Sequence, residues 1–236
     1  MRVLIIGGSG RIGQLVIEDV LKRGHTVTAL VRSSNSLEAR PGLTLITGSP
    51  LSTDDVERAF LANGISSLPE AVVSTLNARR TSDSPFAAPS ADTPPRLMAD
   101  AAENLLQSMK KHGVRKLVAM SSLGTGDSMN NSPWMFRLLF QHSNMKWQFV
   151  DHNAVDQVIR EAASSDGTDG NGRSIDFVLI RSCVLADGEA APVKVLPDNG
   201  QGVGLLSKIT KKSVASFIVD AIETNQYDGR APVIMN

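Results

Sequence analysis

Three glycines between a short apolar strand and an amphipathic helix constrain this sequence more than any other feature. The run from Val3 to Ile6 is short and rich in branched apolar residues, which favours a buried strand over a helix. Gly7, Gly10 and Gly13 follow it at once and lead into a helical pattern. This is the strand–turn–helix context that a dinucleotide-binding glycine motif requires. An ordinary tight turn between a strand and a helix is the alternative.

Each glycine of the motif has its own expected role. Gly7 permits the sharp turn out of the strand, and Gly13 lets the helix pack closely against it. Gly10 lets the backbone approach a pyrophosphate, because a Cβ at that position would collide with the ligand. The free amides and the positive end of the helix dipole then face the phosphates. The motif therefore predicts a phosphate site at the carboxyl end of the first strand.

Composition limits the classes of function that are open to this chain. Basic and acidic residues balance at 24 each, so no net field attracts nucleic acid or an anionic membrane. No run approaches the ~20 apolar residues of a membrane span, and the first apolar run is too short for a signal peptide. The single cysteine, Cys183, fits a reducing compartment. We expect a cytoplasmic protein, monomeric or homodimeric, that takes a small-molecule substrate and binds neither nucleic acid nor membrane.

A basic residue follows the second predicted strand, Thr26 to Val31. The end of this strand contacts the adenosine ribose in dinucleotide-binding folds, where a carboxylate selects NAD and an arginine accommodates the 2′-phosphate of NADP. Arg32 stands there, and Arg11 in the glycine turn adds a second positive charge. We therefore expect NADP (NADPH) as the cofactor. A solvated loop cation is the alternative for Arg32.

The rest of the chain alternates strands with helices. Further strands are predicted over residues 43–47, 71–76, 116–120, 175–180 and 232–235. Helices are predicted from a Ser52 cap to Phe60, from a Thr93 cap to His112, over 151–163, and from Thr210 onward. About seven strands alternating with helices require a Rossmann-like α/β fold with a doubly wound parallel sheet. No repeat or long linker divides the chain, so we expect one NAD(P)-binding domain over residues 1–236.

Four segments lack a clear periodic pattern. Residues 81–95 are rich in Ser, Asp and Pro and follow a strand on the cofactor side, which suits a pocket wall or lid. Residues 129–149 hold most of the aromatic side chains and favour either a partly helical segment beside the pocket or a patch for dimer contact. Residues 164–174 are typical of a solvated polar loop, and residues 186–204 of a Gly- and Pro-containing loop.

Nearly the whole chain resembles the atypical short-chain dehydrogenase/reductases, in particular the NmrA-like and biliverdin reductase B-like (flavin reductase) group. The segments that carry the resemblance are the glycine motif, Val31–Arg32, Leu76–Arg79, Val118–Ser122, Val150–His152 and Val158–Glu161. Two positions depart from the group's pattern. Ser213 replaces the usual aspartate of the last helix, and Arg181–Ser182 replaces an Arg-Pro pair after the sixth strand. These departures concern the substrate pocket more than the cofactor site.

The resemblance implies a cytoplasmic, NADPH-binding Rossmann-like protein with reductase activity. It assigns residues to the coenzyme in four groups: Gly7, Gly10, Arg11, Ile12 and Gly13 at the pyrophosphate, Arg32 at the 2′-phosphate, Leu76, Asn77 and Arg79 along the cofactor, and Ser121 or Ser122 beside the nicotinamide. His152 would face the mouth of the active site.

The usual acid of short-chain dehydrogenases is missing. The only tyrosine, Tyr227, has Ala231 rather than a lysine four residues later. We therefore expect hydride transfer to a planar conjugated acceptor, such as a flavin, a quinone or an aromatic polyketide, that needs little acid catalysis. Ser121 and His152 are the candidate catalytic residues: the hydroxyl would bond a carbonyl or only cap a turn, and the imidazole has an ordinary pKa near ~6.5 that suits proton exchange. Solvent as the proton source, and a surface histidine at a helix start, are the alternatives.

Other functions receive less support from the sequence. A non-catalytic, NADP-binding redox-sensing regulator of the NmrA type remains open, since the absence of an acid dyad is natural there. Ser121, His152 and Asp156 would make a hydrolytic triad, but no nucleophile elbow surrounds the serine. One cysteine and four scattered histidines give no metal-ligand spacing, so no metal is expected.

Overall fold

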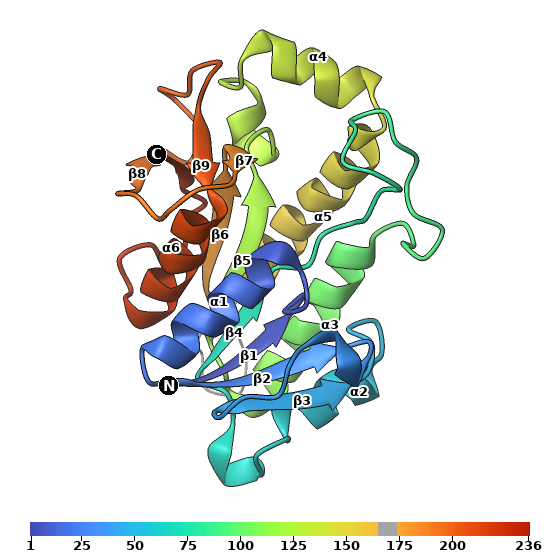
Figure 1. The fold of residues 1–236 in the computed structure, drawn as a ribbon, viewed down its shortest axis with the longest axis vertical. Helices are drawn as coiled ribbons and strands as arrows, with labels where there is room; N and C mark the ends of the chain where they lie inside the picture. Colours follow the sequence, from blue (N-terminus) through green and yellow to red (C-terminus); the bar gives the residue numbers. More distant parts are fainter. Residues whose placement is uncertain (165–173) are drawn as a thin grey trace.

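A computed structural model describes residues 1–164 and 174–236, so most of the loop predicted over residues 164–174 lies outside the described residues (Figure 1). An open sheet of eight strands forms the centre, in the order β3-β2-β1-β4-β5-β6-β10-β8. Its strands are β1 (Arg2–Ile6), β2 (Thr26–Val31), β3 (Leu43–Thr47), β4 (Ala71–Ser74), β5 (Lys116–Ser122), β6 (Asp176–Ser182), β8 (Lys194–Leu196) and β10 (Val233–Met235). All neighbours pair in parallel except β8, which runs antiparallel to β10. The predicted α/β fold is confirmed.

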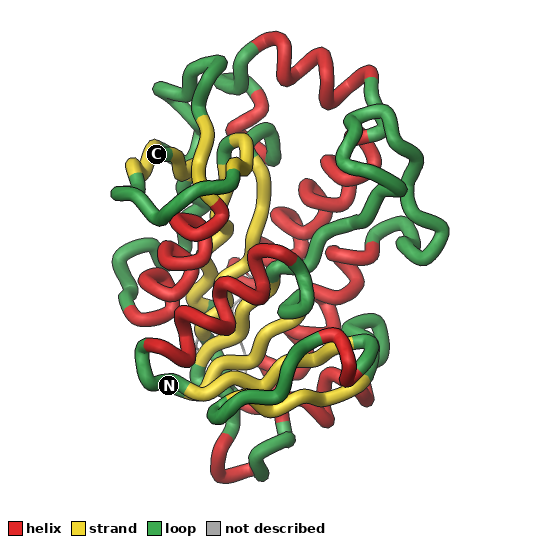
Figure 2. Tube along the Cα trace, viewed as in Figure 1, coloured by secondary structure: helices red, strands yellow, loops and turns green. Residues whose placement is uncertain are grey.

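Helices cover both faces of this sheet (Figures 1 and 2). They are α1 (Arg11–Lys22), α2 (Thr53–Phe60), α3 (Leu97–His112), α4 (Trp134–His142), α5 (Met145–Ser164) and α6 (Lys211–Glu223). Helices α1 and α6 pack on one face, and α2, α3 and α5 pack on the other. A small second sheet pairs β7 (Val184–Ala186) with β9 (Lys208–Thr210). Within the described ranges, no helix is both long and apolar enough to cross a membrane.

Alternation along β1 explains why both faces are apolar. Val3 and Ile5 belong to the core under α1 and α6, whereas Leu4 and Ile6 belong to the core under α2, α3 and α5. All four side chains are at most 2% exposed. Successive side chains of a strand point to opposite faces, so a strand covered by helices on both sides reads as an unbroken apolar run.

The predicted start of α3 is wrong. Thr93 does not cap this helix, which begins at Leu97 after Arg96 in a left-handed conformation (φ 61°). The cap comes from α5, because the buried carboxylate of Asp151 accepts hydrogen bonds from the amides of Met98 (2.9 Å) and Ala99 (3.0 Å). A carboxylate bound to the first amides of a helix performs the role of an N-cap from a distant part of the chain.

Other boundaries also differ from those predicted. Strand β4 ends at Ser74 rather than Leu76, and α5 begins at Met145 rather than Asp151. The segment 129–149 folds mainly as α4 and the first turn of α5. The segment 186–204, expected to be a loop, contains β8, a short strand whose pairing with β10 completes the sheet edge. Three-residue strands are set by such pairing rather than by a local pattern.

The tight contact within the glycine turn yields a stability prediction. A Cβ on Gly13 would lie 2.3 Å from the carbonyl oxygen of Gly7, whereas a Cβ on Gly10 would meet only that same oxygen, at 3.2 Å. Gly13→Ala should therefore lower the free energy of unfolding by about 1–3 kcal/mol. Gly10→Ala, at φ −74° and ψ 166°, should cause no loss. Denaturant unfolding of both variants measures this, and equal stabilities would contradict the packing role of Gly13.

Candidate functional site

The sheet has its topological switch point between β1 and β4. The chain moves outward from β1 to β2 and β3 on one side, and then returns to β4 and β5 on the other. Connections leaving the carboxyl ends of β1 and β4 diverge there, which creates the crevice in which open α/β sheets bind ligands. The glycine turn and the segment after β4 border this crevice, because Thr75 donates its amide hydrogen bond to the Ile6 carbonyl (3.0 Å).

The turn between β1 and α1 has the form of a phosphate cradle. Gly7 adopts φ +77°, and a Cβ there would lie 2.6 Å from the amide nitrogen of Leu76. The first helical hydrogen bond of α1 runs from Gln14 to Gly10 (2.9 Å), so the three amides before Gln14 lie ahead of the helical ladder. Apart from its chain neighbours Ser9 and Arg11, the Gly7 oxygen is the only described contact within 4 Å of a Cβ built on Gly10. The residues present therefore fit a pyrophosphate.

Two of the residues predicted to contact the cofactor pack their side chains against the core. The side chain of Ile12 is 7% exposed and packs in the core under α1, so only its backbone faces the turn. Leu76 is half-buried and packs against the opposite core, with its amide beside Gly7. Asn77 is exposed at the crevice edge.

Three arginines lie around the crevice, and their partners come from one loop. Arg11 contacts Asp83 (3.1 Å), while Arg32 (2.9 Å) and Arg79 (3.6 Å) both contact Asp92. The three arginine side chains are 62–69% exposed. The single carboxylate of Asp92 thus lies between Arg32 and Arg79 and contacts both. The structure thus brings together two arginines predicted from separate strands, around an anion that the sequence analysis did not identify.

The predicted serines end β5, beside β6. Ser121 is 3% exposed and lies opposite Arg181 in the strand register, and Ser122 lies opposite Ser182. The Ser122 hydroxyl donates to the Leu123 carbonyl (3.1 Å), which is the turn-capping role considered from the sequence. In the described chain, no hydrogen bond joins Ser121 to His152.

His152 is buried in α5 rather than exposed at a helix start. Its side chain is 8% exposed, and the Phe149 ring lies 6.4 Å away between centroids. Among the described residues, no partner lies within hydrogen-bond distance of its buried Nδ1. Burial lowers the pKa of His152 to about 4, because a charged imidazolium loses hydration there. The ring is therefore neutral at pH 7, contrary to the ordinary pKa assumed from the sequence.

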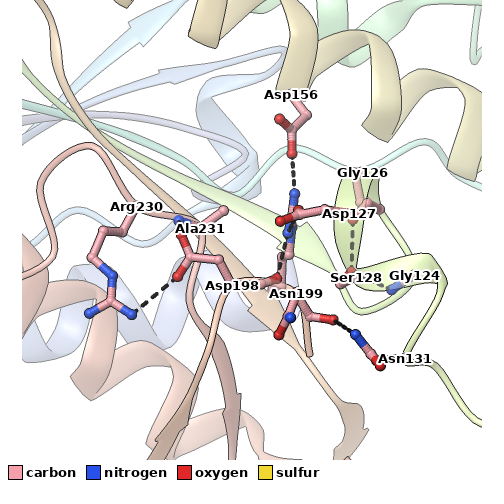
Figure 3. A network of polar contacts seen from close by, with 12 residues as sticks. Gly124, Gly126, Asp127, Ser128, Asn131, Asp156, Asp198, Asn199, Arg230 and Ala231 are labelled. Atoms are coloured by element: carbon pink, nitrogen blue, oxygen red, sulfur yellow. Dashed lines mark hydrogen bonds and ion pairs between the residues drawn. The ribbon is translucent and has the colours of Figure 1, made fainter. Parts of the chain in front are cut away.

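A polar network that includes Asp127, Asp156 and Asp198 lies beyond β6 (Figure 3), and a buried arginine, Arg181, organises it. The Arg181 side chain is fully buried and bonds Asp156 of α5 (2.5 Å), Asp127 and the carbonyl of Asp198 (2.7 Å). Burial alone would raise the pKa of Asp127, but the Arg181 contact holds it below its usual range. A buried arginine whose charge is matched by two carboxylates fixes its surroundings firmly, since removing one partner leaves an uncompensated charge.

Most of this network was not predicted from the sequence. Asp156 was considered only as a member of an unsupported hydrolytic triad, and Arg181 only as a departure from an Arg-Pro pair. A charged residue at the end of an apolar strand is the one local signal, because it requires a counter-ion once buried. The network ties α5 to β6 and to the loop carrying Asp198, next to the strand ends that hold Ser121 and Ser122.

Comparison with known proteins identifies a matching family model. The model described as NAD(P)H-binding matches residues 7–225. The 3-diazoavenalumate denitrifying reductase of a Streptomyces species is 32% identical over 124 residues, which are 51% of this chain and 38% of that protein. The chain thus spans less than half the length of this curated relative.

Solved structures share the fold across the whole chain. An anaerobillin reductase from Escherichia coli, ChuY, superposes with a TM-score of 0.73 at 16% identity, covering 100% of this chain and 97% of that one. A short-chain dehydrogenase/reductase from Veillonella parvula, solved in complex with NADP, superposes with a TM-score of 0.70 at 13% identity, covering 100% and 94%. At these identities the likeness establishes the fold.

The buried imidazole predicts a pH dependence of stability. The pKa of His152 is lowered to about 4 in the folded state, against about 6.5 when unfolded. The unfolded chain therefore binds the extra proton first, and this stabilising contribution is complete above pH 6.5 and lost as the pH falls toward 4. We expect the free energy of unfolding to drop by about 2 kcal/mol more between pH 7.5 and pH 5 than in His152→Phe. Chemical denaturation at each pH measures this; parallel pH profiles would contradict the burial of a neutral ring.

Proposed function

The chain belongs to the NAD(P)H-binding family, and from that premise we propose that it is an NADPH-dependent reductase of a planar conjugated acceptor. The acceptor class is a flavin, a quinone or an aromatic polyketide. The observation that carries the proposal is the glycine turn, open at Gly10, with Arg11, Arg32 and Arg79 at the same edge of the sheet. A backbone cradle and exposed guanidinium groups suit the phosphates of NADPH.

Several segments at the carboxyl ends of the strands would contribute to the proposed coenzyme site. The amides of Arg11, Ile12 and Gly13 would bind the pyrophosphate at the positive end of α1, whose first turn contains no acidic residue. Arg32, with Arg79 beside it, would bind the 2′-phosphate, and Leu76 and Asn77 would lie along the cofactor. When bound, the nicotinamide supplies the hydride. The structural neighbour from Veillonella parvula, which was solved in complex with NADP, supports the choice of a nicotinamide coenzyme.

The acceptor side requires orientation more than acid catalysis. Ser121 or Ser122 would hydrogen-bond the nicotinamide ribose or an acceptor carbonyl at the end of β5. His152 is proposed to border the acceptor as a neutral ring, so that solvent rather than this imidazole supplies the proton at pH 7. Trp134 and Leu138 of α4 are 63% and 48% exposed and offer apolar surface suited to a planar molecule.

A second candidate is a non-catalytic, NADP-binding regulator of the NmrA type. The specific observation in its favour is the neutral, buried His152 in a chain without the Tyr-Lys acid dyad. Such a protein would bind NADP with the same phosphate cradle and would not consume NADPH. The reductase is preferred because a relative is named as a reductase and because Ser121 and Ser122 stand at the strand end that faces the crevice.

Cellular context follows from the same proposal. We propose a cytoplasmic protein, monomeric or homodimeric, whose partner is a small-molecule substrate rather than nucleic acid or a membrane. Its balanced charge supports this. We also propose that residues 1–236 act as one coenzyme-binding domain.

A substitution that fills the open position at Gly10 tests the proposed function. Wild-type protein should oxidise NADPH when supplied with a flavin or quinone acceptor, as followed by nicotinamide absorbance. Gly10→Val should abolish NADPH binding and turnover because its side chain fills the phosphate cradle, while its melting temperature stays near wild type. Binding that survives in a folded Gly10→Val variant would refute the phosphate site. NADP binding without turnover on any acceptor would favour the regulator.

Coenzyme preference should depend on Arg32. Arg32→Ala removes a charge-assisted contact to the 2′-phosphate, so the Kd for NADPH should rise about 10- to 100-fold. The Kd for NADH should change less than about 2-fold, because NADH lacks that phosphate. Arg2→Ala, at the amino end of β1 and so away from the crevice, is the matched control and should change neither value. Equal losses for the two coenzymes in Arg32→Ala would remove its assigned role.

A further inference from the structure

The segment between β4 and α3 is an ordered hairpin rather than an irregular loop. Arg80 and Pro89 form an antiparallel bridge, and the amide of Ser90 donates to the carbonyl of Arg79 (2.9 Å). We call residues 80–92, which follow Arg79, the acidic hairpin, because they contribute two carboxylates to the crevice. Its backbone pairing gives those carboxylates defined positions.

Each carboxylate of the acidic hairpin contacts arginines that are proposed to bind coenzyme phosphates. Asp83 lies 3.1 Å from Arg11, which stands beside the pyrophosphate cradle. Asp92 lies 2.9 Å from Arg32 and 3.6 Å from Arg79, the pair proposed for the 2′-phosphate. Two anions of one hairpin therefore meet the same guanidinium groups that two anionic groups of NADPH would need.

We propose that the acidic hairpin is a displaceable cover of the coenzyme site, in which Asp92 competes with the 2′-phosphate and Asp83 with the pyrophosphate. This inference rests on the proposed function and adds the residue that limits coenzyme selectivity. Arg32 cannot bind Asp92 and a 2′-phosphate in the same geometry, so binding of NADPH requires Asp92 to withdraw. NADH, which lacks the 2′-phosphate, does not require this.

The strength of the contacts suits displacement. Asp83 is 86% exposed and Asp92 is 48% exposed, and the arginines are exposed as well. Exposed ion pairs are individually weak, whereas a phosphate brings more charge and bidentate geometry to the same arginines. The Ser90 hydroxyl and Arg32 hold the pKa of Asp92 below its usual value, so the competing carboxylate is ionised at neutral pH.

The hairpin also contacts the acceptor side of the crevice. Asn144, in the turn between α4 and α5, donates to the carbonyl of Phe86 (2.8 Å), and Gln148 of α5 donates to the carbonyl of Ala78, which precedes the hairpin. Phe86 itself is 68% exposed near the hairpin tip. The hairpin therefore contacts both the phosphate-binding arginines and the turn between α4 and α5. Its withdrawal on coenzyme binding would change the surroundings proposed for the acceptor.

Titration calorimetry with NADP⁺ and NAD⁺ tests the cover. Asp92→Asn keeps the shape of the side chain and removes its charge, so the Kd for NADP⁺ should fall about 3- to 10-fold and that for NAD⁺ less than about 2-fold. Asp83→Asn should tighten both coenzymes by the same factor, because both carry the pyrophosphate. Glu70→Gln is the matched control, since it breaks an exposed pair with Arg2 at the amino end of β1, away from the crevice. It should change neither Kd.

Different outcomes separate this inference from the proposed function. If wild type binds NADP⁺ but Asp92→Asn leaves its Kd unchanged, or tightens NADP⁺ and NAD⁺ equally, the cover is overturned and the coenzyme site stands. If neither wild type nor any variant binds either coenzyme, both proposals fail. Hydrogen exchange gives an independent readout: amides of residues 80–92 should exchange faster with saturating NADP⁺, and unchanged or slower exchange would overturn displacement.

Discussion

The backbone contact between Gly13 and the carbonyl of Gly7 is the constraint on which the rest of the site depends. Because Gly13 carries no Cβ, the first turn of α1 packs directly against the end of β1, and the missing Cβ of Gly7 leaves room for the backbone of Thr75 and Leu76. That packing directs the free amides of α1 into the crevice and leaves Gly10 open. Side chains on this helix or on β1 cannot create such a cradle, because only the backbone approaches closely enough.

Two kinds of charge interaction surround this crevice, and their burial separates their roles. The Arg181 network is buried and paired, so it holds α5 and the strand ends in one arrangement. The pairs made by Asp83 and Asp92 are exposed and individually weak. One set therefore maintains the framework of the site, and the other is free to exchange its partners. A site for a highly charged coenzyme benefits from both, since unpaired arginines at one edge would repel one another.

Local patterns predicted much of this molecule. The strand–turn–helix form of the glycine motif, the succession of the main strands along the chain, the cap at Ser52 and the start of a helix at Thr210 are confirmed, because each depends on residues close in sequence. The family resemblance is confirmed as well. Features that join distant segments were not predicted. The Asp151 cap of α3 depends on how α5 packs against α3, and the burial of His152 depends on tertiary packing around α5; no local pattern records either.

The same distinction between local patterns and contacts of distant segments applies to the candidate site. The strand-end positions of Arg32 and Ser121 follow from a short local sequence, whereas the contact of Arg32 with Asp92 joins positions 60 residues apart.

The most direct test of the proposed coenzyme site is calorimetric titration of folded wild-type protein with NADPH and with NADH. The account predicts saturable binding of both, with the tighter Kd for NADPH. An absence of binding heat for either coenzyme, across several temperatures, would contradict it.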